Sequence, residues 1–256
     1  MTQPSPIWFI SDLHLDISRP AVTLQFLQLL KNLEESNTQS LYILGDLFEF
    51  WIGDDVLDHS LGKPFIPIVD ALRSLTDSGC EIFFIHGNRD FILGELFSER
   101  TSIQMLPEHH IIDLYGEPVL IMHGDTLCTD DHQYQTFRAM SRTAQWQEQL
   151  LSLGVPERIK QAIAMREEST KTTREQSDEI LDVNQSAVEA VMLEYGVKRL
   201  IHGHTHRPAV HEFELESGQP MQRIVLGDWY DQQSHLKYDS GGFELLANNV
   251  TQTYRF

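Results

Sequence analysis

Three histidines at alternate positions are the first feature of the sequence that could support chemistry. The stretch LIHGHTHRPAV contains His202, His204 and His206, with Gly203 between the first two. This spacing is compatible with a satisfied buried cluster, with one face of a helix, or with a set of metal ligands. The choice depends on which other side chains the fold brings to the same place.

Short apolar runs typical of buried strands end abruptly in polar residues elsewhere in the chain. The runs IWFI, LYIL, EIFFI, VLIM and RLI precede the candidate ligands Asp12 and His14, Asp46, Asn88, His123, and His204 and His206. Ligands of α/β sheets gather outside the carboxyl ends of the strands, so these side chains are expected to meet. Their oxygen and nitrogen donors, without a thiolate, favour Mn²⁺, Fe²⁺ or Zn²⁺.

Seven candidate donors are too many for one tetrahedral ion. They suit two ions about 3.5–4 Å apart that share one carboxylate, an arrangement that clamps the attacking and leaving oxygens of phosphoryl chemistry. Each motif alone has an ordinary structural explanation, such as a tight turn at Asp46, a left-handed residue at Asn88 or a hydrogen-bonded His123. Their joint occurrence at five strand ends favours the metal site.

The elements that must position these residues alternate between strands and helices. Helical patterns at 21–36, 65–79 and 182–196 lie between the apolar runs, which predicts layered α/β packing. Residues from about 130 to 177 are helical without a strand and indicate an insertion or lid. A chain of 256 residues with 41% apolar residues fits one domain, 1–256, that carries this insertion.

Charge and cysteine content limit the class of protein. A formal net charge of −19 argues against nucleic acid as the main partner, because phosphate backbones are held by surplus Lys and Arg. Basic residues from Arg138 to Arg174 form a local cluster, either a solvated helical face or a surface toward a polyanion. Two cysteines without C-x-x-C spacing favour a reducing compartment. No signal peptide or 18-residue apolar run is present, so we expect a cytoplasmic chain that does not span a membrane.

The ordered motifs SDLHL, LGDLFEFWIGDD, HGNRD, MHGDTLCTDD and HGHTHRP resemble those of the calcineurin-like metallophosphoesterases. Their variant forms, including GNRDF and LIHGHTHRPAVH, closely resemble the UDP-2,3-diacylglucosamine hydrolases of Gram-negative lipid A synthesis. The resemblance implies a four-layer α/β/β/α sandwich with an inserted helical lid. It also implies two ion sites, one of Asp12, His14, Asp46 and His206 and one of Asp46, Asn88, His123 and His204, bridged by Asp46. His202 would then support the loop.

Arg89 stands where many members of the superfamily have a histidine able to protonate a leaving group. Arginine does not donate protons near neutral pH, but it can grip phosphate oxygens, which favours cleavage of a phosphoanhydride over a simple monoester. The resemblance implies that a metal-activated hydroxide attacks the α-phosphorus of UDP-2,3-diacylglucosamine, giving UMP and 2,3-diacylglucosamine 1-phosphate. Asn88, Arg89 and His204 would hold the phosphoryl oxygens, and the two divalent ions would most naturally be Mn²⁺.

The resemblance also implies substrate contacts from the insertion. Asp131 and Ser169 match the family pattern, whereas Thr173 and Gln176 stand where Asn and Lys are expected. The apolar residues Trp146, Leu150, Leu153 and Ile163, with Phe48, Phe50 and Trp51, either line an apolar cleft for acyl chains or form the core of the insertion. A lipid substrate further predicts peripheral association with the cytoplasmic face of the inner membrane, through the basic and apolar insertion.

Two other functions remain open at this point. A nucleotide or nucleic-acid phosphodiesterase of the same superfamily is disfavoured by the acidic charge and by Arg89. A metal-free binding scaffold is disfavoured because every motif ligand is present.

Overall fold

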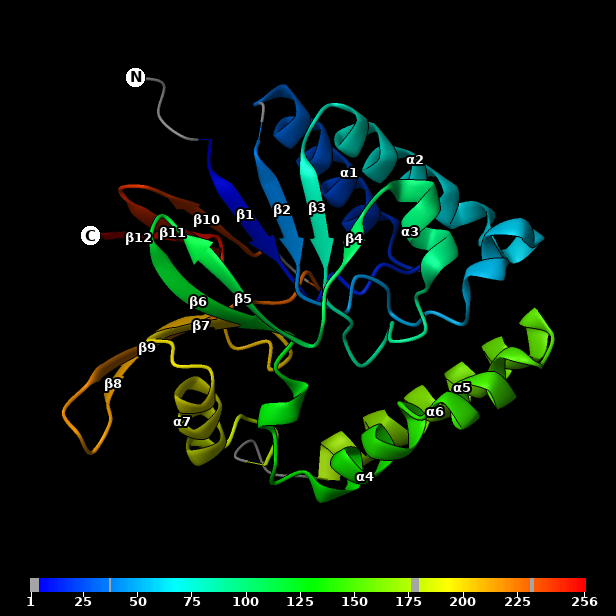
Figure 1. Cartoon of the computed structure of the whole chain (residues 1–256). Helices are drawn as coiled ribbons and strands as arrows, with labels where there is room; N and C mark the ends of the chain where they lie inside the picture. The colour runs from blue at the N-terminus through cyan, green and yellow to red at the C-terminus, as the bar shows by residue number, and fades with distance from the viewer. Residues whose placement is uncertain (1–4, 37, 176–179, 231–232) are drawn as a thin grey trace.

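Two β-sheets packed face to face form the centre of the molecule (Figure 1). The computed structural model describes residues 5–36, 38–175, 180–230 and 233–256, and for 168–175 the backbone alone. The seven-stranded sheet has the order β12 (Val250–Arg255), β11 (Gly242–Ala247), β10 (His235–Asp239), β1 (Ile7–Ile10), β2 (Ser40–Ile43), β3 (Glu81–Phe84) and β4 (Gln104–Met105). The five-stranded sheet has the order β5 (His109–Leu114), β6 (Glu117–Met122), β7 (Arg199–His202), β9 (Pro220–Val225) and β8 (Ala209–Glu214).

Helices cover the outer face of each sheet. The larger sheet packs against α1 (Pro20–Glu35), α2 (Ile66–Asp77) and α3 (Glu95–Thr101), and the smaller sheet packs against α7 (Gln185–Glu194). Alternation along β1 explains the two buried interfaces, since Phe9 packs between the sheets while Ile10 packs toward α1. The predicted four-layer α/β/β/α sandwich is confirmed.

Strand direction brings the candidate ligands together. β1, β2 and β3 run parallel, so the turns that follow them meet at one edge of the larger sheet. β6 and β7 are parallel in the smaller sheet and bring His123 and His204 to the matching edge. The site therefore lies where the carboxyl ends of both sheets converge.

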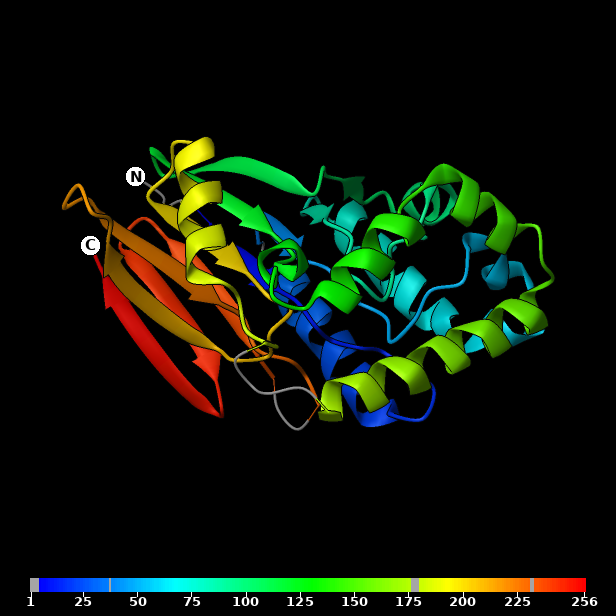
Figure 2. The ribbon, with the colours of Figure 1, turned by 90° about the horizontal axis from the view of Figure 1, so that it is seen from below.

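The predicted insertion forms three helices, α4 (His132–Ser141), α5 (Ala144–Leu151) and α6 (Val155–Glu175). They lie beyond the carboxyl ends of β1, β2 and β3 (Figures 1 and 2). Side chains of Asp131 and Thr143 cap α4 and α5 by accepting hydrogen bonds from the backbone N–H of the third residue of each helix. Two short 3₁₀ helices, Asp54–Asp58 and Ser60–Phe65, lie in the segment that α6 packs against.

Four arginines of the insertion point toward the rest of the protein. They are Arg138, paired with Asp125 and Glu108; Arg142, bonded to the carbonyl of Gly87; Arg158, paired with Asp55; and Arg166, paired with Glu49. The interpretation as a solvated face is wrong for Arg138, Arg142 and Arg158, whose side chains are 14%, 21% and 1% exposed, whereas Arg166 is 43% exposed. Lys160 is 74% exposed and is paired with Glu157 on its own helix.

Arg158 is the most buried of these anchors, with 1% of its side chain exposed. Its guanidinium donates to Asp55 Oδ1 at 2.8 Å and also to the carbonyl of Ile52. Arg158→Met would leave that carbonyl without its donor, so we expect a loss of about 1–3 kcal/mol in the free energy of unfolding. Lys160→Met, on the same helix, should change stability by less than about 0.5 kcal/mol. Denaturant titration of both variants checks this, and equal stability would contradict the anchoring role.

Aromatic residues beside the Gly45-Asp46 motif belong to the core. Phe48 is fully buried and Trp51 is 3% exposed, in contact with Phe65 and Phe97. The interpretation of Phe48 and Trp51 as lining of an open apolar cleft is therefore wrong. Trp146 is half-buried beside Phe91 and Phe137. No helix in the described part of the chain has the length and apolarity needed to cross a bilayer.

Candidate active site

Strained backbone marks the loops that carry the candidate ligands. Asp12, His14, Asp46, His204 and His206 all have positive φ, from 49° to 70°. Non-glycine residues rarely adopt this left-handed conformation, and each such residue costs of order 1–3 kcal/mol unless its surroundings hold it. Five of the seven predicted ligands share it, so the loops are shaped to present these side chains rather than for local stability.

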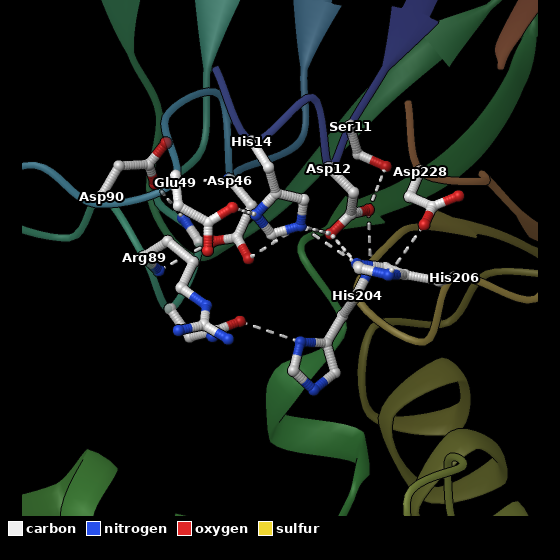
Figure 3. A network of polar contacts seen from close by, with 12 residues as sticks. Ser11, Asp12, His14, Asp46, Glu49, Arg89, Asp90, His204, His206 and Asp228 are labelled. Carbon is white, nitrogen blue, oxygen red and sulfur yellow. Dashed lines mark hydrogen bonds and ion pairs between the residues drawn. The ribbon is translucent and has the colours of Figure 1, made fainter. Parts of the chain in front are cut away.

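One group of possible ligands consists of Asp12, His14 and His206 (Figure 3). His14 Nε2 lies 3.1 Å from His206 Nε2, and His206 Nε2 lies 3.4 Å from Asp12 Oδ1. The ligand atoms of the three residues all lie within 4.8 Å of one another. Two rings and a carboxylate at these distances can hold one divalent ion.

A second group consists of Asp12, Asp46 and His123. Asn88 and His204 lie next to it, because Asn88 Oδ1 is 3.0 Å from His123 Nε2 and 2.9 Å from His204 Nδ1. The fold thus brings together all seven predicted ligands.

Asp46 extends toward both groups. Its Oδ2 is 3.9 Å from His14 Nε2, and its Oδ1 is 3.8 Å from His123 Nε2. Asp12 also belongs to both groups. The bridging role of Asp46 stays a prediction, and its two oxygens are disposed as a bridge requires.

Two glycines allow the loops to approach closely. A Cβ added at Gly87 would lie 2.1 Å from Asp46 Oδ1, and one at Gly203 would lie 2.3 Å from Asp12 Oδ2. Real Cβ contacts are never so short, so these positions require glycine. The G-N and G-H motifs therefore serve packing of the ligand loops as well as ligation.

The electrostatics of the cluster favour a cation. Burial raises the pKa of Asp46 to about 7, and the carboxylates of Asp90 and Asp12 act in the same direction. Burial opposes protonation of His206, but hydrogen bonds to Asp12 and Asp228 outweigh it and raise its pKa to about 10. The carboxylates of Asp12 and Asp228 thus favour a positive charge at His206. Metal binding there would replace that proton.

His14 and His204 are suited to ligation in the neutral form, whereas burial lowers the pKa of His123 but the carboxylates of Asp46, Asp12 and Asp125 outweigh it and raise that pKa. Burial lowers the pKa of His204 to about 3 and that of His14 well below its usual value. Within the described residues, His14 Nδ1 is buried without a hydrogen-bond partner. Unpartnered buried polar atoms are costly, so the donor set fits a bound cation.

His202 takes no part in the cluster. Its Nδ1 lies 2.8 Å from the carbonyl of Gly203, and Arg223 donates to its Nε2 at 3.2 Å. Burial lowers its pKa to about 3, and the Arg223 guanidinium acts in the same direction. Both ring nitrogens are engaged away from the ligands, as a loop-supporting role requires.

The predicted substrate residues are placed less completely. Arg89 is half-buried, and its backbone N–H donates to Asp46 Oδ1 at 2.8 Å. Asp131 caps α4, accepting from the Tyr134 N–H at 2.9 Å. The side chains of Ser169 and Thr173 and the whole of Gln176 lie outside the described residues.

Several functional neighbours were missed by the sequence reasoning. Asp90 Oδ2 accepts from the N–H of Leu47 at 2.7 Å, and its Oδ1 accepts from Gly87 at 2.9 Å, so it ties two ligand loops together. Asp228 Oδ2 lies 3.2 Å from His206 Nδ1. Asp90 is the last residue of the HGNRD motif, and Asp228 follows Gly227 at the end of an apolar run. Their positions at strand ends could have indicated that they lie beside the ligands.

Glu49 and Asp125 are two further buried carboxylates beside the ligands. Glu49 faces His14, with its Oε2 3.7 Å from the ring Nδ1. Asp125 accepts hydrogen bonds from Tyr134 and Arg138 of α4. Their motifs, GDLFEFW and HGDT, give no indication of these long-range partners.

Comparison with known proteins agrees with this geometry. A family model described as calcineurin-like phosphoesterase matches residues 5–208. A protein of Stenotrophomonas maltophilia named UDP-2,3-diacylglucosamine hydrolase is 48% identical over 244 residues, covering 93% of this chain and 96% of its own. The protein of that name from Serratia proteamaculans is 45% identical, with 93% and 97% covered.

Among solved structures, a dimetal phosphatase from Danio rerio has a TM-score of 0.54 at 12% identity, with both chains fully covered, and shows the shared fold. The match to the family model covers most of the chain, and the named relatives extend along nearly all of it. The chain therefore belongs to the calcineurin-like phosphoesterases and, within them, to the UDP-2,3-diacylglucosamine hydrolase family of enzymes.

Proposed function

We propose that this protein hydrolyses the pyrophosphate bond of UDP-2,3-diacylglucosamine, releasing UMP and 2,3-diacylglucosamine 1-phosphate in lipid A biosynthesis. The observation that carries the proposal is the pair of overlapping ligand groups, which share Asp12 and lie at the converging edges of the two sheets. Two-ion sites of this kind serve phosphoryl chemistry. The choice of substrate follows from the name of the relatives that are 45–48% identical to this chain.

The donor set suits two divalent ions, and we propose Mn²⁺. Carboxylate, amide and imidazole donors without a thiolate support this choice. Bound there, the ions supply a water of lowered pKa and stabilise charge on the phosphoryl oxygens. The protein positions its own groups around them: Asp90 fixes the loops of Asp46 and Asn88, and Asp228 orients His206.

Arg89, Asn88 and His204 are proposed to hold the phosphoryl oxygens. Asn88 and His204 already face each other at 2.9 Å, and the backbone bond of Arg89 to Asp46 places its side chain beside the predicted bridge. Arg89 does not protonate a leaving group near neutral pH, so departure must produce a stable anion. A phosphate monoester leaving from a pyrophosphate meets that condition, whereas an alkoxide does not.

We further propose that 130–177 acts as a lid in a single domain, 1–256, and that Asp131, Ser169, Thr173 and Gln176 contact the substrate. The anchoring of α4 supports this, because Tyr134 and Arg138 bind Asp125, two residues after His123. Closure over the metal site would exclude water and position the nucleotide and sugar.

Substrate comparison tests the proposed reaction. Chelator-stripped protein should release UMP from UDP-2,3-diacylglucosamine after Mn²⁺ is restored, and should be inactive while a chelator is present. A cyclic nucleotide and an aryl phosphodiester serve as competing substrates. Faster cleavage of either of these, or hydrolysis that persists in the chelator, would contradict the proposal.

Peripheral membrane association is proposed from the lipid substrate and from exposed apolar residues of the lid. Met140, Leu151 and Ile163 are 51%, 43% and 44% exposed. Because the side chains of Arg138, Arg142 and Arg158 are largely buried in contacts with the rest of the protein, apolar contacts should dominate over charge. We expect the triple change Met140→Gln, Leu151→Gln and Ile163→Gln to lower co-sedimentation with phospholipid vesicles.

Leu193→Gln is the matched control, because this residue is 58% exposed on α7, outside the three helices of the lid. It should leave vesicle binding unchanged. Binding that is equally affected by the control, or unaffected by the triple change, would contradict association through the lid.

A further inference from the structure

Glu49 lies between the candidate metal ligands and the lid, and no ligand role was assigned to it. Its side chain is 1% exposed, three residues after Asp46 in the loop that follows β2. Its backbone N–H donates to the carbonyl of Leu15 at 3.1 Å, and the Leu15 N–H donates to Leu47 at 2.9 Å. The loop that carries Glu49 is therefore fixed to the loop that carries His14.

Four side chains contact the Glu49 carboxylate, namely His14, which Figure 3 shows beside it, Arg19, Arg166 and the hydroxyl of Tyr230. Oε2 is 2.7 Å from an Arg19 nitrogen and 3.7 Å from His14 Nδ1. Oε1 is 3.0 Å from Nε of Arg166, which comes from the lid helix α6. One buried carboxylate thus touches the ligand loop with one oxygen and the lid with the other.

The other ligand rings show what Glu49 does for His14. His123 points Nδ1 at the carbonyl of Leu44, 2.8 Å away, and His206 points Nδ1 at Asp228, 3.2 Å away. In both rings Nε2 is left facing the centre of the cluster. Oxygen partners of this kind fix the tautomer and orientation of metal-binding histidines.

His14 lacks such a hydrogen bond within the described residues, and the Glu49 carboxylate is the oxygen that faces its Nδ1. The Tyr230 ring stacks on one face of the His14 ring, with their centroids 5.1 Å apart. The Arg19 guanidinium in turn lies over the Tyr230 ring, 4.3 Å from its centroid. Stacking on Tyr230 thus restricts rotation of the ring, and the Glu49 carboxylate lies on the side of Nδ1.

We propose that Glu49 is a positioning residue that couples docking of α6, through Arg166, to the orientation of His14 at the metal centre. The inference rests on the proposed function, because it requires His14 to bind metal. Withdrawal of Arg166 would release Oε1 and leave Oε2 held by Arg19 and by the hydroxyl of Tyr230, so the carboxylate would be less firmly oriented toward His14. Coupling free energies act in both directions, so metal binding should also hold the lid helix more firmly.

Mn²⁺ binding to the full-length, chelator-stripped protein tests the coupling without a turnover assay. Isothermal titration with Mn²⁺ alone compares wild type with Glu49→Gln, Arg166→Met and the double variant. Loss of an outer partner of a metal-binding histidine typically weakens metal affinity about 10–100-fold, which is the expectation for Glu49→Gln. Arg166 pairs with Glu49, and we expect Arg166→Met to weaken Mn²⁺ binding about fivefold through that carboxylate.

The double variant should bind Mn²⁺ no more weakly than Glu49→Gln alone, because both changes interrupt one path. Lys160→Met is the matched control, a cation removed from the same helix without a contact to the ligand loops, and it should bind like wild type. Hydrogen exchange of residues 155–167 should slow when Mn²⁺ is added to wild type, and much less in Glu49→Gln.

Mn²⁺ affinity of Arg166→Met within about twofold of wild type, with unchanged exchange in α6, would overturn the coupling. The comparison of Arg166→Met with wild type remains valid even if Glu49→Gln fails to fold, because Arg166 is 43% exposed and its loss leaves the core intact. Wild-type protein that binds no Mn²⁺ would overturn the metal assignment and, with it, the coupling. The two failures are therefore distinguishable.

Discussion

Asp46→Asn should abolish turnover and remove bound metal while the protein stays folded. Asp46 has an oxygen toward each ligand group, and replacing one by an amide nitrogen removes the ligand predicted to serve both ions. Loss of a shared ligand should lower kcat by at least about a thousandfold, or roughly 4 kcal/mol in the barrier. Asparagine tolerates the left-handed backbone at this position, where φ is 52°, so the loop should keep its shape.

Elemental analysis and a thermal melt check this prediction together. Asp46→Ala should behave alike in metal content but melt lower, because alanine is strained at positive φ. Folded Asp46→Asn protein with the metal content of wild type would show that the shared-ligand assignment is wrong.

Substitution of the three alternate histidines should separate ligation from support. His204→Ala and His206→Ala should each lower kcat/KM by about a hundredfold or more, since each removes a predicted ligand. His202→Ala should retain metal but lose about 1–3 kcal/mol of stability, because it leaves the buried Arg223 without an acceptor. Metal titration and denaturant unfolding of the three variants measure the two effects. Equal loss of metal in all three would contradict the division.

The ligand residues could be predicted because each lies within four residues after the end of a strand. An apolar run that ends shortly before Asp12 or Asp46 predicts both a strand and the turn after it. Parallel pairing of β1 with β2 then brings the two turns together. The strained φ angles at these positions, and the glycines that permit close approach, were not evident from residue order. They depend on how neighbouring loops pack.

Contacts between distant segments could not be predicted. Arg158 and Asp55 are 103 positions apart, and an arginine on a polar helix looks the same in sequence whether it faces water or a buried partner. The role of Glu49 was missed for the same reason, because its partner Arg166 lies on α6, far along the chain from the loop that follows β2. Phe48 and Trp51 were recognised as apolar, but periodicity does not say whether an apolar side chain fills the core or lines a cleft.

Hydrolysis of UDP-2,3-diacylglucosamine in water enriched in ¹⁸O tests the central claim most directly. Attack of metal-activated water on the α-phosphorus places the new oxygen on the nucleotide, so mass spectrometry should find one ¹⁸O in UMP and none in 2,3-diacylglucosamine 1-phosphate. Label in the sugar phosphate would place the attack on the other phosphorus. Release of UDP in place of UMP would contradict pyrophosphate hydrolysis altogether.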